Sequence, residues 1–155
     1  MSSHNVSISI DTTGRGWGSA WRTRDRDARA VISAAAAVSN GGRNGGSLEV
    51  VFASDATLRE LNRRFRGKDK PTNVLSFPNP LTPFGSIILA FETIRDESLA
   101  QNKTFIDHAK HMILHGFLHL LGYDHEAAAE RRLMERLEIR ILADMGIPNP
   151  YLLAK

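Results

Sequence analysis

The chain has 155 residues, of which 42% are hydrophobic, and its formal net charge is +3. This length predicts a single domain, residues 1–155, that can bury a core of its own. The absence of cysteine excludes disulfides and thiolate metal sites, which leaves histidine to hold any zinc. The first residues lack the apolar core of a signal peptide, and no apolar run reaches membrane-spanning length. We therefore expect a soluble, cytoplasmic protein with no membrane partner; its mild basicity permits a nucleic-acid partner.

Four short strands and about five helices are expected along the chain. The strands are predicted at residues 6–10, 48–53, 74–77 and 86–90, where β-branched and other apolar residues cluster or alternate. The helices are predicted at residues 25–39, 55–65, 92–101, 105–121 and 126–145. Glycine-rich segments at 11–18 and 40–46 are expected to be loops. These elements predict an α+β fold with a small mixed four-stranded sheet packed against the helices.

Two of the predicted helices are amphipathic. In the helix at 55–65, which Ser54 or Asp55 is expected to cap, the core face is predicted to carry the apolar side chains Leu58, Leu61 and Phe65. In the helix at 126–145, the side chains predicted to point inward are Leu133, Leu137 and Ile141.

Three of the six histidines lie within residues 115–125, at spacings that suit one metal ion. His115 and His119 are four residues apart, so on a helix they share one face. Gly122 can then adopt the left-handed conformation that ends a helix, and the turn would bring His125 to the same point. Three imidazole nitrogens with a fourth position open are typical of a catalytic zinc site. The sequence thus predicts one Zn²⁺ per chain, held by His115, His119 and His125.

The spacing of these histidines is metzincin-like, with one difference. The metalloprotease motif places a general-base glutamate directly after the first histidine, whereas Gly116 stands there in this chain. The pattern therefore predicts a zinc hydrolase whose chemistry is not ordinary peptide hydrolysis.

A polar stripe of four histidines runs along the helix predicted at 105–121. Its members are His108, His111, His115 and His119, and most of the remaining circumference is apolar. Burying imidazoles without partners is unfavourable, and a bound metal removes that penalty. His111 is either a fourth ligand or a residue that supports the site; its place before the Gly122 turn favours the second interpretation.

Basic residues cluster between residues 59 and 70. Arg59 and Arg63 are interpreted as a solvated helix face. Arg66, Lys68 and Lys70 are expected in a loop after the helix, where ligand contacts concentrate. A guanidinium there can hold a phosphate by two hydrogen bonds and stabilise the charge of a phosphoryl transition state.

Two long motifs resemble the bacterial YbeY family. They are R-G-K-D-K-P-T-N-V-L-S-F-P at residues 66–78 and H-G-F-L-H-L-L-G-Y-D-H at residues 115–125, within a resemblance that covers about residues 48–150. The resemblance implies a zinc-dependent, single-strand-specific endoribonuclease of ribosomal RNA maturation. It implies zinc ligation by His115, His119 and His125, and a catalytic, substrate-binding role for Arg66.

The resemblance also carries biological expectations. It implies small-subunit rRNA 3′-end processing, ribosome quality control and ribosome-associated protein partners, with no DNA substrate. Two features depart from the family pattern. Ser86 stands where members usually have aspartate, and residues 1–45 match poorly.

The sequence leaves several alternatives open. Zinc lowers the pKa of its bound water, and either the resulting hydroxide or the ribose 2′-hydroxyl attacks phosphorus. A ribosome-assembly binding factor with a mainly structural zinc is the second interpretation, since the motif lacks an obvious general base. A metallopeptidase or amidase is the third, and Gly116 argues against it.

Overall fold

The computed structural model describes residues 6–38, 46–79, 82–123 and 127–152. In this part of the chain it contains four strands and six helices. In chain order they are β1 (Ser7–Thr12), α1 (Trp17–Ala20), α2 (Arg24–Val38), β2 (Ser47–Ala53), α3 (Asp55–Arg66), β3 (Val74–Asn79), β4 (Thr82–Ala90), α4 (Phe91–Ala100), α5 (Phe105–Leu120) and α6 (Ala128–Asp144).

The four strands form one mixed sheet in the order β1-β2-β4-β3. β1 pairs with β2, and β2 with β4, in parallel. β3 runs antiparallel to β4 and forms an edge of the sheet. The α+β class and the mixed four-stranded sheet predicted from the sequence are therefore confirmed.

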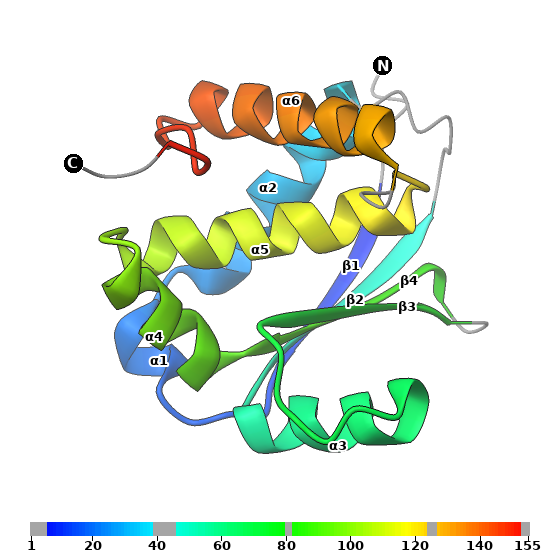
Figure 1. The fold of residues 1–155 in the computed structure, drawn as a ribbon, viewed down its shortest axis with the longest axis vertical. Coiled ribbons are helices and arrows are strands. Elements are labelled where there is room, and N and C mark those ends of the chain that lie inside the picture. The colour runs from blue at the N-terminus through cyan, green and yellow to red at the C-terminus, as the bar shows by residue number, and fades with distance from the viewer. Residues whose placement is uncertain (1–5, 39–45, 80–81, 124–126, 153–155) are drawn as a thin grey trace.

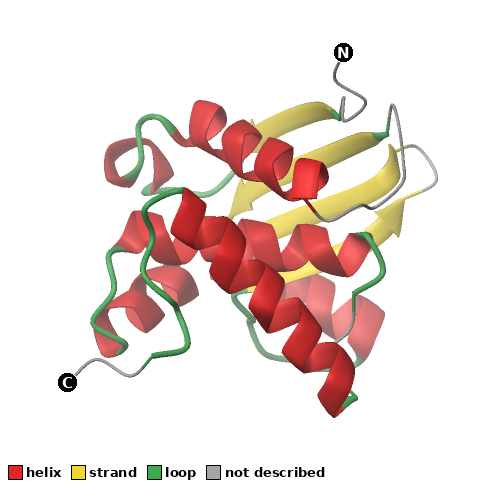
Figure 2. Cartoon of the chain, turned by 90° about the horizontal axis from the view of Figure 1, so that it is seen from above, coloured by secondary structure: helices red, strands yellow, loops and turns green. Residues whose placement is uncertain are grey.

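The helices cover the sheet unequally. α5 crosses one face together with α2, and α6 lies across these helices on the side away from the sheet, whereas α3 lies against the opposite face (Figure 1). The view from above shows α6 running diagonally over α5, with α2 beside it (Figure 2). None of the helices in the described residues is long and apolar enough to cross a membrane.

Alternation along the strands divides the apolar residues between two cores. In β2, Val50 and Phe52 belong to the large core on the α2 and α5 face, whereas Val51 and Ala53 belong to the small core under α3. Successive side chains of a strand point to opposite faces, so a strand covered on both sides reads as a continuous apolar run.

Two tryptophans near the N-terminus, for which the sequence suggested no role, are fully buried in the large core. The indole N–H of Trp17 donates to the Ala53 carbonyl at 2.8 Å, and its ring lies 4.8 Å, centroid to centroid, from that of Phe52. The indole N–H of Trp21 donates to the Asp27 carboxylate at 2.9 Å. These partners satisfy the polar ends of two large apolar groups, so both residues support the fold.

The element boundaries differ from the predicted ones in several places; β4, for example, begins at Thr82 and not at residue 86. The segment expected to be a loop at 11–18 continues β1 to Thr12 and then begins the short helix α1. Helix α3 extends to Arg66, because Gly67 ends it one residue later than predicted, with a φ of 70°. Arg66 thus belongs to the last turn of α3 and not to the loop.

Two residues predicted to face the core are exposed. Phe65 of α3 is 61% exposed and Leu133 of α6 is 44% exposed. In α6 the buried stripe carries Met134, Glu138 and Leu142. A charged residue is seldom fully buried unless it is paired, so helical periodicity alone does not predict the burial of Glu138.

Candidate metal centre and adjoining cleft

Helix α5 carries the histidines, and both of its ends are defined by local hydrogen bonds. The Thr104 side chain accepts from the Asp107 backbone N–H at 3.1 Å and caps the N-terminus. At the C-terminus, Gly122 has a φ of 105° and donates to the His119 carbonyl, while the N–H of Tyr123 donates to that of Leu118. These two bonds form a Schellman motif. The predicted turn at Gly122 is confirmed, and His125, which follows it, lies outside the described residues.

The histidine stripe of α5 is paired with carboxylates that the sequence did not reveal. His108 Nε2 lies 2.8 Å from Glu97 of α4. His111 Nε2 and His115 Nδ1 lie 3.0 Å and 2.8 Å from the same oxygen of Glu138. Burial of these three imidazoles therefore does not by itself require a metal, contrary to the argument from sequence.

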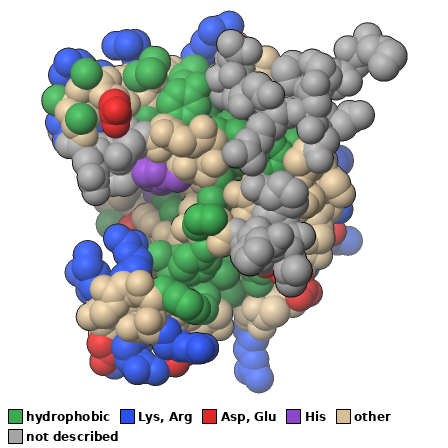
Figure 3. Space-filling model, turned by 90° about the vertical axis from the view of Figure 1, so that its right-hand side faces the viewer, with side chains coloured by type: hydrophobic (Ala, Val, Ile, Leu, Met, Phe, Trp, Pro, Cys, Tyr) green, Lys and Arg blue, Asp and Glu red, His purple; other side chains and the backbone are tan. Residues whose placement is uncertain are grey.

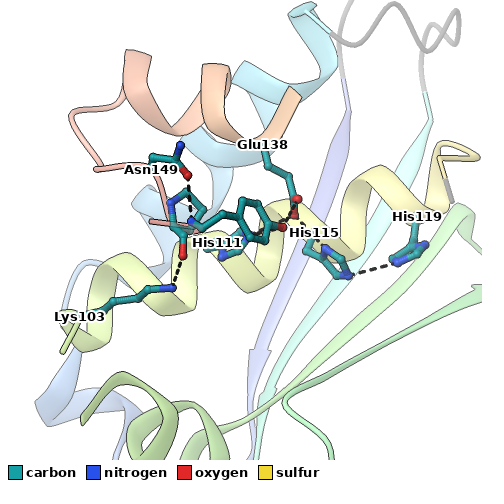
Figure 4. Close-up of polar contacts among 8 residues, drawn as sticks. Lys103, His111, His115, His119, Glu138 and Asn149 are labelled. Carbon is teal, nitrogen blue, oxygen red and sulfur yellow. Dashed lines mark hydrogen bonds and ion pairs between the residues drawn. The ribbon is translucent and has the colours of Figure 1, made fainter. Parts of the chain in front are cut away.

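Glu138 reaches down from α6 to the middle of α5, as Figure 4 shows. It is fully buried and also accepts a hydrogen bond from the Tyr151 hydroxyl. Burial raises the pKa of Glu138, but the hydrogen bonds from His111 and His115 outweigh it and lower the pKa to about 2. Glu138 is therefore a carboxylate at neutral pH, and a carboxylate only accepts hydrogen bonds.

The charge state of Glu138 fixes the protonation of its neighbours. His111 must donate through Nε2 and His115 through Nδ1. Burial lowers the pKa of His111, which keeps its ring neutral. Burial and the hydrogen bond to Glu138 raise the pKa of Tyr151, which keeps its hydroxyl protonated. In neutral His115, the lone pair then lies on Nε2.

His115 Nε2 and His119 Nε2 lie 3.2 Å apart, at the end of the network farther from Lys103 (Figure 4). In a tetrahedral zinc site with Zn–N bonds of about 2.05 Å, two ligand nitrogens are separated by roughly 3.3 Å. The observed separation has the length of a hydrogen bond between the two rings, and it is also compatible with a pair of ligands to one zinc ion.

Among the described residues, a second combination of atoms could also hold a metal ion. It comprises His111, His115 and Glu138, whose ligand atoms all lie within 4.8 Å of one another. Two of its three contacts involve Glu138 and have hydrogen-bond lengths, 2.8 Å and 3.0 Å. Metal binding at this group would replace the hydrogen bonds that orient His115.

Gly116 lies where α5 packs closely against the sheet. A Cβ at this position would lie 2.8 Å from Ser76 Oγ and 3.1 Å from Ile87 Cγ2. The Ser76 hydroxyl donates to the Gly116 carbonyl at 3.1 Å. Residues of the sheet thus occupy the space next to Gly116, where the metalloprotease motif has its glutamate. A side chain larger than that of glycine fits there only if neighbouring atoms move.

A cleft of about 490 Å³ opens beside His115 and His119 and over the edge strand β3. Arg66 lines it from the end of α3, although α3 and α5 lie on opposite faces of the sheet. The residues around the cleft are Phe65, Arg66, Thr72, Asn73, Val74, Leu75, Ser76, Phe77, His115 and His119. Figure 3 shows histidine beside hydrophobic side chains on this side of the molecule, with Lys and Arg side chains gathered below.

The other basic residues of the segment lie outside this lining. Lys68 and Lys70 are exposed in the loop after α3, close in sequence to Arg66. Arg59 pairs with Asp69 at 2.8 Å, and Asn62 donates to the Lys70 carbonyl at 2.9 Å, so the loop is tied to α3. Arg59 and Arg63 form exposed ion pairs, as expected of a solvated helix face.

Ser86, the residue that departs from the family pattern, is on β4 and nearly buried. Its hydroxyl donates to the Glu49 carboxylate of β2 at 2.8 Å. It alternates with Ile87, which packs in the large core near Gly116, so it points to the other face of the sheet.

Comparison with known proteins places these features in a family context. The family model described as Endoribonuclease YbeY matches residues 20–146. A protein named Endoribonuclease YbeY from Chelativorans sp. (strain BNC1) is 49% identical over 129 residues, which cover 78% of each chain. The protein of that name from Nitrobacter winogradskyi is 44% identical over 146 residues, covering 84% of this chain and 76% of the relative.

Two further comparisons agree with this picture. The protein of the same name from Methylocella silvestris is 51% identical over 109 residues, covering 67% of this chain and 62% of the relative. A solution structure of a Thermotoga maritima protein matches with a TM-score of 0.52 at 24% identity, covering 90% of this chain and 91% of that chain. The structural likeness supports the fold.

Proposed function

We propose that this chain, which belongs to the endoribonuclease YbeY family, is a zinc-dependent endoribonuclease that cleaves single-stranded regions of ribosomal RNA in the cytoplasm. The observation that carries the proposal is the cleft that brings His115 and His119 of α5 together with Arg66 of α3. The name of the relatives supports RNA as the substrate. The role in small-subunit rRNA 3′-end processing, and the ribosome-associated partners, rest on the family resemblance.

We assign the zinc ligands to His115, His119 and His125. The 3.2 Å separation of the two Nε2 atoms supports the pairing of His115 with His119, and the family resemblance adds His125. The hydrogen bond from His115 Nδ1 to Glu138 supports it as well, because a histidine that binds metal through one ring nitrogen commonly donates the other to a carboxylate. In this assignment Glu138 and His111 orient His115 and do not touch the metal. A bound zinc supplies a Lewis acid and a water of lowered pKa.

Arg66 supplies the positive charge for the phosphate. It is exposed at the end of α3 and lines the cleft next to the histidines. Its guanidinium can bind two phosphate oxygens at once and hold the scissile group against the histidine pair. Lys68 and Lys70 are proposed to contact the flanking phosphates of the same strand.

A ribosome-assembly binding factor with a mainly structural zinc is the second candidate. One observation favours it: none of the described residues that line the cleft is a carboxylate able to serve as general base. Such a protein would bind RNA through the same cleft and would cleave it only slowly.

Cleavage assays on the purified, zinc-loaded protein separate the two candidates. We expect it to cut a structured rRNA fragment within single-stranded segments, to spare duplex RNA and to leave casein intact. His115→Ala and Arg66→Ala should abolish or strongly reduce cleavage, whereas Arg66→Lys should restore part of it. Arg95→Ala, which removes an exposed arginine of α4, is the charge-matched control. Binding with no cleavage by the wild type would favour the assembly factor, and casein hydrolysis would favour a peptidase.

A further inference from the structure

Phe65 is an exposed aromatic residue at the rim of the cleft. It ends the apolar stripe of α3, yet 61% of its surface is exposed. Its ring contacts that of Phe77 of β3, with 5.6 Å between the ring centroids and an interplanar angle of 58°. Phe77 packs against the small core, so it gives Phe65 a fixed neighbour. The fold thus holds an aromatic ring in place while leaving much of its surface uncovered.

The cleft extends around the edge of the sheet and joins this ring to the histidine pair. Ser76 points to the α5 side, where its hydroxyl donates to the Gly116 carbonyl. Phe77, the next residue, belongs to the core on the α3 side. Both residues line the same cleft as Phe65 and His119. A linear ligand lying in the cleft would therefore contact both phenylalanines, Phe65 and Phe77, as well as the histidine pair.

The charge around Phe65 indicates what kind of linear ligand the cleft would bind. Arg66 lines the cleft beside it, and the Arg64 guanidinium lies 5.5 Å from the centroid of its ring. Lys68 and Lys70 are exposed in the loop that follows. Cationic groups around a largely exposed aromatic ring, one of them lying over the ring itself, match a ligand that alternates anionic phosphates with flat bases.

We propose that Phe65, supported by Phe77, is a stacking platform for one base of a single-stranded RNA whose neighbouring phosphate is bound by Arg66. This inference rests on the proposed function and adds to it a base-binding subsite. It gives a physical reason for single-strand preference, because the bases of a duplex are already stacked and cannot turn onto a protein ring. Every base has a flat face, so the subsite tolerates any sequence.

Binding measurements on the full-length, zinc-loaded protein test the subsite. The probe is a fluorescein-labelled, single-stranded 2′-O-methyl oligonucleotide, and its integrity is checked on a gel after each anisotropy titration. We expect Phe65→Ala to weaken binding about ten-fold, within the roughly 5- to 150-fold range that loss of one stacked base produces. Phe65→Trp should bind as tightly as the wild type or more tightly. Phe65→Leu should resemble Phe65→Ala, because it keeps an apolar side chain and loses the ring.

Leu99→Ala provides the matched control, since Leu99 is a 75% exposed apolar residue on α4 and outside the cleft lining. It should bind like the wild type. A second series replaces one nucleotide at a time by an abasic unit. One abasic position should weaken wild-type binding and have no further effect on Phe65→Ala, which identifies the base that stacks.

The outcomes separate this inference from the proposed function. If the wild type binds the probe and Phe65→Ala or Phe65→Leu binds it equally well, the stacking platform is wrong and the nuclease proposal is untouched. If the wild type neither binds nor cleaves single-stranded RNA, the proposed function itself fails. Equal melting temperatures for the wild type, Phe65→Ala and Phe65→Leu are expected, because Phe65 is largely exposed; a large loss of stability would show a structural role and overturn the inference.

Discussion

Glu138 of α6 accepts a hydrogen bond from Nδ1 of His115 of α5 across 2.8 Å. The two residues are 23 positions apart and belong to different helices. The contact determines which nitrogen of His115 carries the proton and leaves Nε2 facing His119. The packing of α6 on α5 therefore determines which nitrogen of His115 is available to bind a metal ion, namely Nε2.

Replacing Glu138 should weaken metal binding without removing a ligand. In Glu138→Gln the amide keeps the size of the side chain, but its NH₂ group faces N–H donors and its charge is gone. We expect zinc affinity to fall about 10- to 100-fold, as is typical when a carboxylate behind a ligating histidine is lost. Competition with a chromogenic chelator measures this change. Glu130→Gln, at an exposed position of α6, should leave the affinity unchanged.

The ligand set can be tested by metal content. Elemental analysis should find about one equivalent of zinc per chain of the wild type, and chelation should lower the melting temperature. His119→Ala and His125→Ala should lose most of the metal, whereas His111→Ala should retain it with reduced affinity. The opposite pattern, with metal lost in His111→Ala and kept in His119→Ala, would assign the ion to the His111, His115 and Glu138 group.

Gly116→Ala should destabilise the fold by about 1–3 kcal/mol, the range typical of overpacking a well-packed interior. The added Cβ would lie 2.8 Å from Ser76 Oγ, so the Ser76 side chain or the elements that carry the two residues have to shift. Urea unfolding followed by circular dichroism measures the loss. Gly18→Ala, where a Cβ would have no neighbour within 4 Å, is the control. A Gly116→Ala variant as stable as the wild type would show that the helix and sheet adjust freely.

Glu97 should make stability depend on pH in the acid range. Burial raises the pKa of Glu97, but hydrogen bonds from His108 and Asn73 outweigh it, so the pKa in the folded protein lies below the ordinary 4.5. A depressed carboxyl pKa stabilises the fold above pH 4.5, and this contribution disappears as pH falls through the folded-state pKa. Nearby Lys103 favours the charged form as well.

The free energy of unfolding should therefore be about 1–2 kcal/mol lower in Glu97→Gln than in the wild type at pH 7, and the difference should shrink as pH falls from 4.5 through the folded-state pKa. Denaturation at a series of pH values measures the difference. Asp96→Asn, at an exposed position of the same helix, should follow the wild type. A difference that stays constant down to pH 3 would contradict the assigned pKa shift.

Local patterns in the sequence were enough to determine the elements that carry the site. The spacing of His115 and His119, followed by Gly122, predicted a helix and its C-terminal turn, and both are present. Apolar runs and alternation predicted the four strands and the mixed sheet. These features depend on backbone periodicity and on the conformational freedom of glycine, which act within a few residues.

Only the tertiary structure decided which distant residues meet. Glu138 looks like any charged residue of an amphipathic helix, and its burial against the histidine stripe depends on how α6 packs on α5. Phe65 matched the core pattern of α3 yet is exposed, because the stripe extends beyond the small core beneath the helix. Arg66 lines the same cleft as the histidines although α3 lies on the other face of the sheet, because β3 between them is an edge strand. Side-chain periodicity identifies a face of an element, whereas the packing of elements determines what that face contacts.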